Sequence, residues 1–248
     1  METATVNQEL IAAQERLLAK RQDLKAMENP GLSSPNTDLT EIIERCKQKA
    51  KDSGVIDFPA TAKEEKPKSL LAHCGVDKKY LQCSFENFQG GEKIKADLLH
   101  LTRSGKSVLL AGNTGCGKTH LSVAMLAEYL KHGKHDALFI TLPDLLLEIR
   151  SSFSDKGLMT EKELVDLYSS KPFLVLDDMG AEKPTEFTVA TLSLILDRRI
   201  RQERQTIITT NLISIKAIEE YSSARIASRI SEMETVKVSM PDYRKKRK

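Results

Sequence analysis

The feature that most constrains the fold is a glycine-rich stretch at residues 112–119, with the sequence GNTGCGKT. It matches the pattern G-x-x-x-x-G-K-[ST], in which the backbone N–H groups of a tight loop and the N-terminus of the next helix surround a phosphate group. The apolar run at 108–111 is typical of a buried strand, and residues 119–132 have the apolar spacing of a helix that Gly133 ends. This order of strand, loop and helix predicts a phosphate-binding site.

The residue types in the loop suit a nucleotide that carries a metal ion. Gly115 and Gly117 allow backbone conformations and close approaches that a side chain would block. Lys118 is expected to reach the β- and γ-phosphates, and the hydroxyl group of Thr119 is expected to hold Mg²⁺. We therefore predict ATP and Mg²⁺ as cofactors, bound by the loop and the residue after it: Gly112, Asn113, Thr114, Gly115, Cys116, Gly117, Lys118, Thr119 and His120.

Apolar segments typical of strands alternate with helical segments through the rest of the main domain. The strand candidates are residues 108–111, 137–141, 173–177, 206–210 and 235–239. The helix candidates are residues 119–132, 143–153, 160–169, 185–201 and, in two pieces, 213–231. Thr160 and Glu163 have the spacing of a capping box. The alternation predicts an α/β fold of the P-loop NTPase type, with a five-stranded parallel sheet and flanking helices.

An apolar strand that ends in two acids, FLVLDD at residues 173–178, is the second chemical element. Asp177 at the end of the strand is expected to join the Mg²⁺ shell. Asp178 is expected to orient and deprotonate an attacking water molecule. The alternative is that the pair only ends the strand, but its position after the glycine-rich loop favours a Walker B motif.

A third apolar strand, at residues 206–210, ends in Asn211. In P-loop ATPases with an added strand, this strand lies between the loop strand and the acidic strand, so Asn211 would face the γ-phosphate and the water molecule. The alternative is that Asn211 starts a turn or caps the next helix, since asparagine is favoured in both places.

The chain divides into a helical N-terminal region (1–53), a linker (54–68) and an ATPase domain with a basic C-terminal tail (69–248). Leu10, Leu17 and Leu24 lie on one face of the first predicted helix. Such thin amphipathic helices bury little by themselves, so they form a small hairpin, pack on the main domain or bind a partner protein. An apolar stripe needs a cover, and we therefore favour the partner.

The formal net charge of +3 conceals an uneven distribution, because residues 244–248 are RKKRK. Such a tail either contacts nucleic acid or is a solvated end. The 248 residues contain no apolar run of the ~20 needed to span a bilayer, and no secretion signal precedes the first helix. We therefore expect a cytoplasmic protein without a membrane partner. The cysteines form no C-x-x-C pair, which argues against a structural zinc site and favours free thiols: Cys46, Cys74, Cys83 and Cys116.

With these elements in place the chain resembles the AAA+ ATPases, and more narrowly the DnaC/IstB family of bacterial and phage helicase loaders and transposition helpers. The resemblance covers residues 69–244 and rests on five segments: CSFENF at 83–88, LDDMG at 176–180, TTN at 209–211, RIASRI at 225–230 and DYR at 242–244. Two features depart from the broader AAA+ pattern. Asp178 stands where many AAA+ proteins have glutamate, and no helical lid domain follows the sheet.

The resemblance implies a role for three residues. Asn211 would be sensor 1, Arg244 would be sensor 2 at its own nucleotide, and Arg229 would be an arginine finger that acts on the ATP of a neighbouring subunit. The expected catalytic set is then Lys118, Asp178, Asn211 and Arg229. Arg225 lies one helical turn before Arg229 on the same face. The alternative for both arginines is surface ion pairing with Glu219, Glu220 or Glu232.

The resemblance implies an ATP-hydrolysing helicase loader. Its N-terminal helices would grip a hexameric, DnaB-type replicative helicase, and its ATPase domain would bind single-stranded DNA and self-associate through a shared ATP site. One alternative is an IstB-like transposition helper that acts on duplex DNA with a transposase. Another is a small-molecule P-loop kinase, although the acid pair followed by Asn211 favours water as the phosphate acceptor. A GTP-binding switch is disfavoured because the chain has no N-K-x-D motif.

Overall fold

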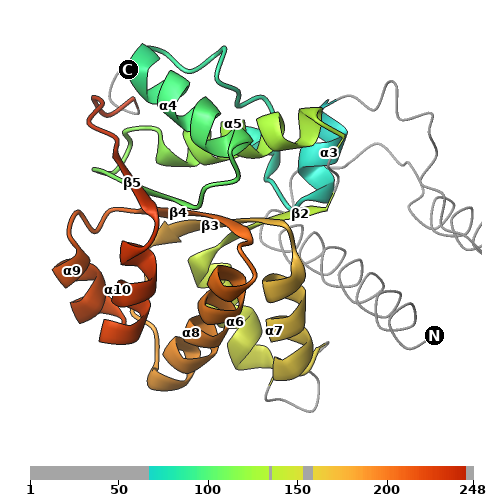
Figure 1. The fold of residues 1–248 in the computed structure, drawn as a ribbon, viewed down its shortest axis with the longest axis vertical. Coiled ribbons are helices and arrows are strands. Elements are labelled where there is room, and N and C mark those ends of the chain that lie inside the picture. Colours follow the sequence, from blue (N-terminus) through green and yellow to red (C-terminus); the bar gives the residue numbers. More distant parts are fainter. Residues whose placement is uncertain (1–66, 134–135, 153–158, 244–248) are drawn as a thin grey trace, which may run out of the picture.

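The computed structural model describes residues 67–133, 136–152 and 159–243 (Figure 1). The predicted N-terminal helices, most of the linker, Cys46, Arg244 and the basic tail lie outside these residues. Within the described residues no helical domain follows the sheet, and no helix is both long enough and apolar enough to cross a membrane.

The sheet has five parallel strands in the order β2-β3-β4-β1-β5. The strands are β1 (Val108–Ala111), β2 (Ala137–Thr141), β3 (Phe173–Met179), β4 (Gln205–Thr210) and β5 (Glu234–Lys237). Strand β4 lies between β1 and β3, and Ala111 pairs with Thr210 at the end of both strands. Both the five-stranded parallel sheet and the inserted position of β4 are therefore confirmed. The ends of β1, β3 and β4 meet at one edge of the sheet, where the glycine-rich loop begins.

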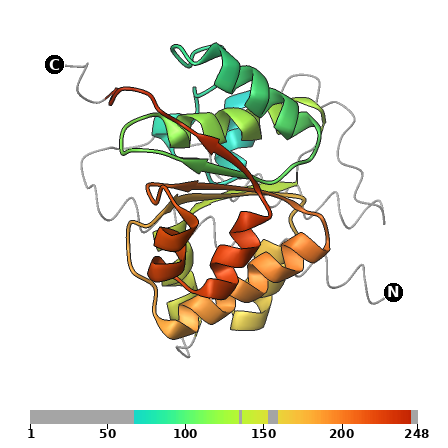
Figure 2. The ribbon, with the colours of Figure 1, turned by 60° about the vertical axis from the view of Figure 1, so that its left-hand side comes forward.

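Helices cover the sheet on both faces (Figures 1 and 2). One face carries α3 (Pro67–His73), α4 (Glu92–Arg103) and α5 (Lys118–Lys131). The other face carries α6 (Leu142–Ser151), α7 (Glu161–Ser170), α8 (Glu186–Arg201), α9 (Ile215–Tyr221) and α10 (Ala224–Ser231). Thr160 is the N-cap of α7 and forms the predicted capping box with Glu163.

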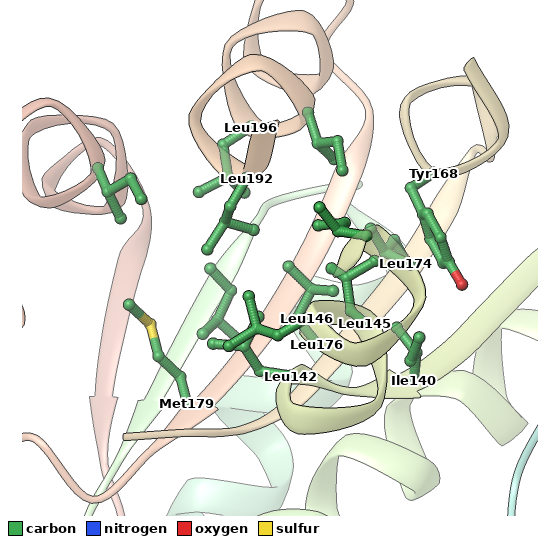
Figure 3. Packing of buried hydrophobic residues seen from close by; sticks show 14 of the residues in the cluster. Ile140, Leu142, Leu145, Leu146, Tyr168, Leu174, Leu176, Met179, Leu192 and Leu196 are labelled. Carbon is green, nitrogen blue, oxygen red and sulfur yellow. The ribbon is translucent and has the colours of Figure 1, made fainter. Parts of the chain in front are cut away.

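Each face of the sheet has its own apolar core, because successive side chains of a strand point to opposite faces. In β3, Leu174 and Leu176 pack among the helices of one face, and Phe173 and Val175 pack against the other. Figure 3 shows the first core, where Leu174 and Leu176 lie beside the leucines of α6 and α8. A strand buried on both sides reads as a continuous apolar run, which is why the sequence indicated β3 clearly.

Helices α3 and α4 were not predicted. Helix α3 begins at Pro67, so the last two residues of the predicted linker, 67–68, belong to a helix; proline suits a first helical turn, where its missing N–H is not needed. Helix α4 buries Leu98 fully while most of its other residues stay at least partly exposed. Its many charged residues, and the two glycines that precede it at 90–91, concealed the helical spacing.

The three described cysteines carry free thiols, as predicted. All are buried, and Cys116 in the glycine-rich loop is 1% exposed. Burial raises the pKa of Cys74 to about 12 and that of Cys83 to about 11, so both stay protonated at neutral pH. Cys116 therefore acts as a small apolar residue beneath the loop.

Candidate functional site

The glycine-rich loop depends on glycine for both conformation and space. Gly117 is the N-cap of α5 with φ 95°, and Gly115 has φ 80°, values that side chains strongly disfavour. A Cβ atom on Gly117 would lie 2.6 Å from Cε2 of Phe88, and one on Gly115 would lie 1.9 Å from Oδ1 of Asp242. The loop is therefore held between Phe88, which precedes α4, and the segment that follows β5.

Lys118 is buried at the first position of α5, and its ammonium group is bonded to the loop itself. Nζ donates hydrogen bonds of 2.9 Å to the backbone oxygens of Gly112 and Asn113. The positive charge is thereby kept beside the loop, where it can exchange these carbonyl partners for phosphate oxygens. Asn113 and Thr114 are exposed at the tip of the loop.

Asp177 on β3 is bonded both to α5, the helix after the loop, and to the neighbouring strand β4. Its carboxyl group, 4% exposed, accepts hydrogen bonds from the hydroxyl of Thr119 at 2.9 Å and from the hydroxyl of Thr209 at 2.7 Å. Burial raises the pKa of Asp177 above its ordinary value, against the effect of the two hydroxyl donors. Carboxylate and hydroxyl oxygens suit Mg²⁺, and a bound cation would offset the cost of burying the charge. The residues present therefore fit the predicted metal.

Asp178 differs from both of its neighbours in the strand. It is exposed, whereas Asp177 and Met179 are buried, and its φ is 62°. The register of β3 against β4 shifts between Leu176 and Met179, and the backbone N–H of Asp178 donates to the hydroxyl of Thr209 at 2.9 Å. A left-handed conformation at a residue other than glycine costs of order 1–3 kcal/mol and is retained where the surrounding structure imposes it, often at functional sites.

Asn211 lies at the end of β4 and next to the acidic strand. A Cβ atom on Gly180, which has φ 106°, would lie 2.4 Å from Oδ1 of Asn211. Glycine at position 180 thus lets the amide group approach the backbone just beyond Asp178. The alternative role of Asn211 as a helix cap is wrong, because Ser214 is the N-cap of α9 and accepts from the backbone N–H of Ala217.

Three aromatic side chains border the loop on the side of α4, and of these the sequence assigned only His120 to the site. The ring of Phe88 packs edge-on against His120 and Tyr243, with centroid distances of 5.2 Å and 5.9 Å. Burial lowers the pKa of His120, and its Nε2 lies 3.0 Å from the backbone oxygen of Ser84. The backbone N–H of Tyr243 donates to the oxygen of Gly115 at 3.1 Å. The only sequence signals were the segments at 83–88 and 242–244.

Arg225 and Arg229 lie on α10, on the sheet face opposite α5 (Figure 1). Nε of Arg229 donates to Oδ1 of Asp197 at 2.6 Å, and its Nη1 donates to Glu232 at 2.8 Å. Arg225 donates to the other carboxylate oxygen of Asp197. The ion pair with Glu232 was among the predicted alternatives for Arg229, but Asp197 was missed because it lies on α8, far away in the sequence.

The structure therefore brings together the loop, Thr119, Asp177, Asp178 and Asn211 at one edge of the sheet, and Arg229 belongs to a separate cluster. Residues 76–248 match the family model described as IstB-like ATP binding protein.

Curated relatives share a similar stretch of sequence. The chain is 28% identical over 172 residues to the protein named replicative helicase loader DnaC of Escherichia coli strain K12. The aligned stretch covers 65% of this chain and 69% of that protein. It is 28% identical over 158 residues to the protein of the same name from Buchnera aphidicola subsp. Baizongia pistaciae, covering 60% of this chain. The match spans 64% of the length of that relative.

Solved structures show a similar fold. A crystal structure of the DnaC helicase loader has a TM-score of 0.57 at 24% identity, covering 66% of this chain and all of that one. The replication initiator DnaA bound to AMPPCP and single-stranded DNA also has a TM-score of 0.57, at 21% identity, covering 67% of this chain and 51% of that one. At these identities the likeness concerns the fold alone.

Proposed function

Because the chain belongs to the family of IstB-like ATP binding proteins, we propose that it hydrolyses ATP to load a hexameric replicative helicase onto single-stranded DNA. The observation that carries the ATPase part is the contact between the Thr119 hydroxyl and the buried Asp177 carboxyl. It joins the phosphate loop to the acidic strand, and β4 brings Asn211 to the same edge. The similarity to proteins named replicative helicase loader DnaC supports the loader part.

The residues of the chain divide the work of hydrolysis as follows. Backbone N–H groups of residues 113–118 and the ammonium group of Lys118 bind the phosphates. Thr119 and Asp177 would hold Mg²⁺, which would neutralise negative charge on the phosphate oxygens. Asp178, exposed beside this pair, orients the attacking water molecule and accepts its proton, and the amide group of Asn211 helps to place the same molecule.

Water is the proposed acceptor rather than a small molecule. Asp178 is the exposed acid at the end of β3, and the Asn211 amide lies against the next glycine, Gly180. A polar pair of this kind suits a water molecule. A kinase would need an acceptor pocket and usually an arginine-rich lid, and the helices that follow β4 supply two arginines that are already ion-paired.

The proposed partners follow from the division of the chain. Residues 1–53 carry the apolar stripe of Leu10, Leu17 and Leu24 and would grip a DnaB-type helicase. Arg229 would complete the ATP site of a neighbouring copy, which makes self-association part of the activity. Arg244 follows Tyr243, whose backbone is bonded to the loop, and we assign Arg244 to its own nucleotide.

Two measurements test the proposal. ATP hydrolysis by the full chain should rise with single-stranded DNA, and Asp178→Asn should keep ATP binding and lose turnover, because Asp177 and Thr119 are intact. Undiminished hydrolysis by Asp178→Asn would place the base elsewhere. Hydrolysis that needs a small-molecule acceptor instead of DNA would identify a kinase.

The partner is tested by co-purification with hexameric helicases, with and without residues 1–60. We expect the full chain to retain a helicase and the shortened chain to hydrolyse ATP without retaining it. Retention by the shortened chain would refute the role of the N-terminal helices. Stimulation by duplex DNA together with retention of a transposase would favour the transposition helper.

A further inference from the structure

One carboxylate away from the phosphate loop holds two arginines. Asp197 lies on α8, and the exposed fraction of its side chain is 6%. Arg225 and Arg229 lie one turn apart on α10, and their side chains are 66% and 39% exposed. The anion is thus buried between the helices, while both cations extend from it toward the surface.

The ion pairs determine the charge state of this cluster. Burial by itself raises the pKa of Asp197, but the hydrogen bonds from Arg229 and Arg225 outweigh that effect and hold the pKa below its ordinary value. The carboxylate therefore stays charged at neutral pH. A charged acceptor bonded to guanidinium N–H groups makes stronger hydrogen bonds than a neutral one, with better-defined geometry.

The contacts of Arg229 define the plane of its guanidinium group. Nε donates to Asp197 and Nη1 donates to Glu232, so two different nitrogens are held by two carboxylates. Glu232 is itself 47% exposed, and exposed ion pairs contribute little. An arginine side chain has about 2 kcal/mol of rotamer entropy to lose when it is ordered. The buried carboxylate is therefore the contact that orders Arg229 in the isolated chain.

We propose that Asp197 is a positioning residue, which holds Arg229 ready to act on the ATP of a neighbouring subunit. Arg225 shares the carboxylate and limits its movement, since both oxygens are occupied. This inference rests on the proposed function, because it assumes that Arg229 acts across a subunit interface. If Asp197 instead kept Arg229 away from its target, removing the carboxylate charge would raise the rate of ATP hydrolysis.

The chain offers a matched control in Asp166, whose ion-pair partner Arg198 is the residue after Asp197. Arg198 on α8 donates to Asp166 on α7 at 2.5 Å, and this ion pair also joins two helices of the same face. The Asp166 side chain is 40% exposed and has no place in the proposed site. Asp166→Asn therefore removes a carboxylate charge without touching Arg229.

The first measurement is steady-state ATP hydrolysis on single-stranded DNA. We expect Asp197→Asn to lower kcat by about 10–100-fold, the size of effect that small misplacement of a catalytic group produces. The KM for ATP should stay unchanged, since the loop is intact. Asp166→Asn should behave as the wild type, and Asp197→Glu should recover part of the loss. Circular dichroism checks that each variant is folded.

The second measurement mixes inactive variants, because a shared site lets two of them complement each other. Lys118→Ala supplies an intact Arg229, and Arg229→Ala supplies an intact loop, so their mixture should recover activity. Asp197→Asn should recover with Lys118→Ala, which brings a properly held Arg229. Asp197→Asn should not recover with Arg229→Ala, because neither variant supplies a positioned arginine.

Each other outcome overturns a stated part of the reasoning. Unchanged or raised kcat in Asp197→Asn refutes positioning, and so does recovery of Asp197→Asn with Arg229→Ala. If the mixture of Asp197→Asn with Lys118→Ala recovers no activity, the carboxylate of Asp197 stabilises the whole domain instead of positioning Arg229. If Lys118→Ala and Arg229→Ala fail to complement each other, the shared ATP site itself is wrong, and the role of Asp197 falls with it.

Discussion

Replacing Thr209 by valine tests whether the junction of β3 and β4 depends on a single hydroxyl group. Thr209 is 1% exposed. Its hydroxyl donates to Asp177 at 2.7 Å and accepts the backbone N–H of Asp178 at 2.9 Å. Valine keeps the shape of the side chain and removes both hydrogen bonds. The buried carboxyl group and the N–H group then each lose a partner.

The expected loss of stability follows from these two contacts. Leaving a buried polar group without its partner costs about 1–3 kcal/mol, and burying a methyl group in place of the hydroxyl returns about 1 kcal/mol. The two groups together cost about 2–6 kcal/mol, so the free energy of unfolding of Thr209→Val should fall by about 1–5 kcal/mol. Thr209→Ser is the matched control: it keeps the hydroxyl and loses one methyl group, which costs about 1 kcal/mol.

The deficit should also depend on pH, because burial already raises the pKa of Asp177 in the folded state and losing a hydroxyl donor raises it further. A group whose folded pKa is raised contributes stability in acid and loses it as the pH rises through that pKa. The difference in the free energy of unfolding between wild type and Thr209→Val should therefore be smallest in acid. It should grow as the pH rises from the pKa of Asp177 in the folded wild type to its higher pKa in the folded variant.

The assay is urea unfolding followed by circular dichroism, with a metal chelator present and over a range of pH. We expect the order wild type, Thr209→Ser, Thr209→Val from most to least stable. The reasoning is refuted if Thr209→Val is as stable as Thr209→Ser, or if its deficit shrinks as the pH rises.

Three further substitutions test the loop and its neighbours. Lys118→Ala should abolish tight ATP binding, measured by calorimetry, while thermal unfolding shows a folded domain; tight binding by the folded variant would mean that the loop is not a working phosphate site. Gly115→Ala should weaken ATP binding, since φ is 80° and the new Cβ would meet Asp242 at 1.9 Å, and unchanged affinity would contradict this. Gly180→Ala should displace Asn211 and reduce the rate of ATP hydrolysis more than the affinity for ATP; a loss of affinity alone would argue against the role of Asn211 in placing the water molecule.

Local patterns in the sequence predicted the sheet because four of its five strands are buried on both faces, β5 being the exception. A continuous apolar run such as residues 173–176 stands out from its polar neighbours, and the glycine-rich stretch located the loop strand. Helix α4 was missed because only one side of it is buried, so its charged residues are as numerous as the apolar ones.

The contacts that complete the site were less predictable, since they join residues far apart in the chain. Phe88 reaches Gly117 and Tyr243, and no local pattern indicates which aromatic residue will pack against a glycine. Asp197 reads as one more polar residue of an amphipathic helix, and its role emerges only when α10 packs beside α8. Ser214 caps α9, a position for which Asn211 was an equally suitable residue type.

The place of β1 in the sheet has a consequence during synthesis of the chain. Val108 pairs with Ile207 on one side and with Glu234 on the other, and both partners leave the ribosome long after β1. At the usual rate of synthesis, about 5–20 residues per second, β1 waits roughly 5–20 seconds for even the first of them. Until then its apolar run has no sheet to join and is open to chaperones or aggregation. A message cut short before β5 would yield a chain with every residue of the phosphate loop but without the segment after β5 that contacts Gly115.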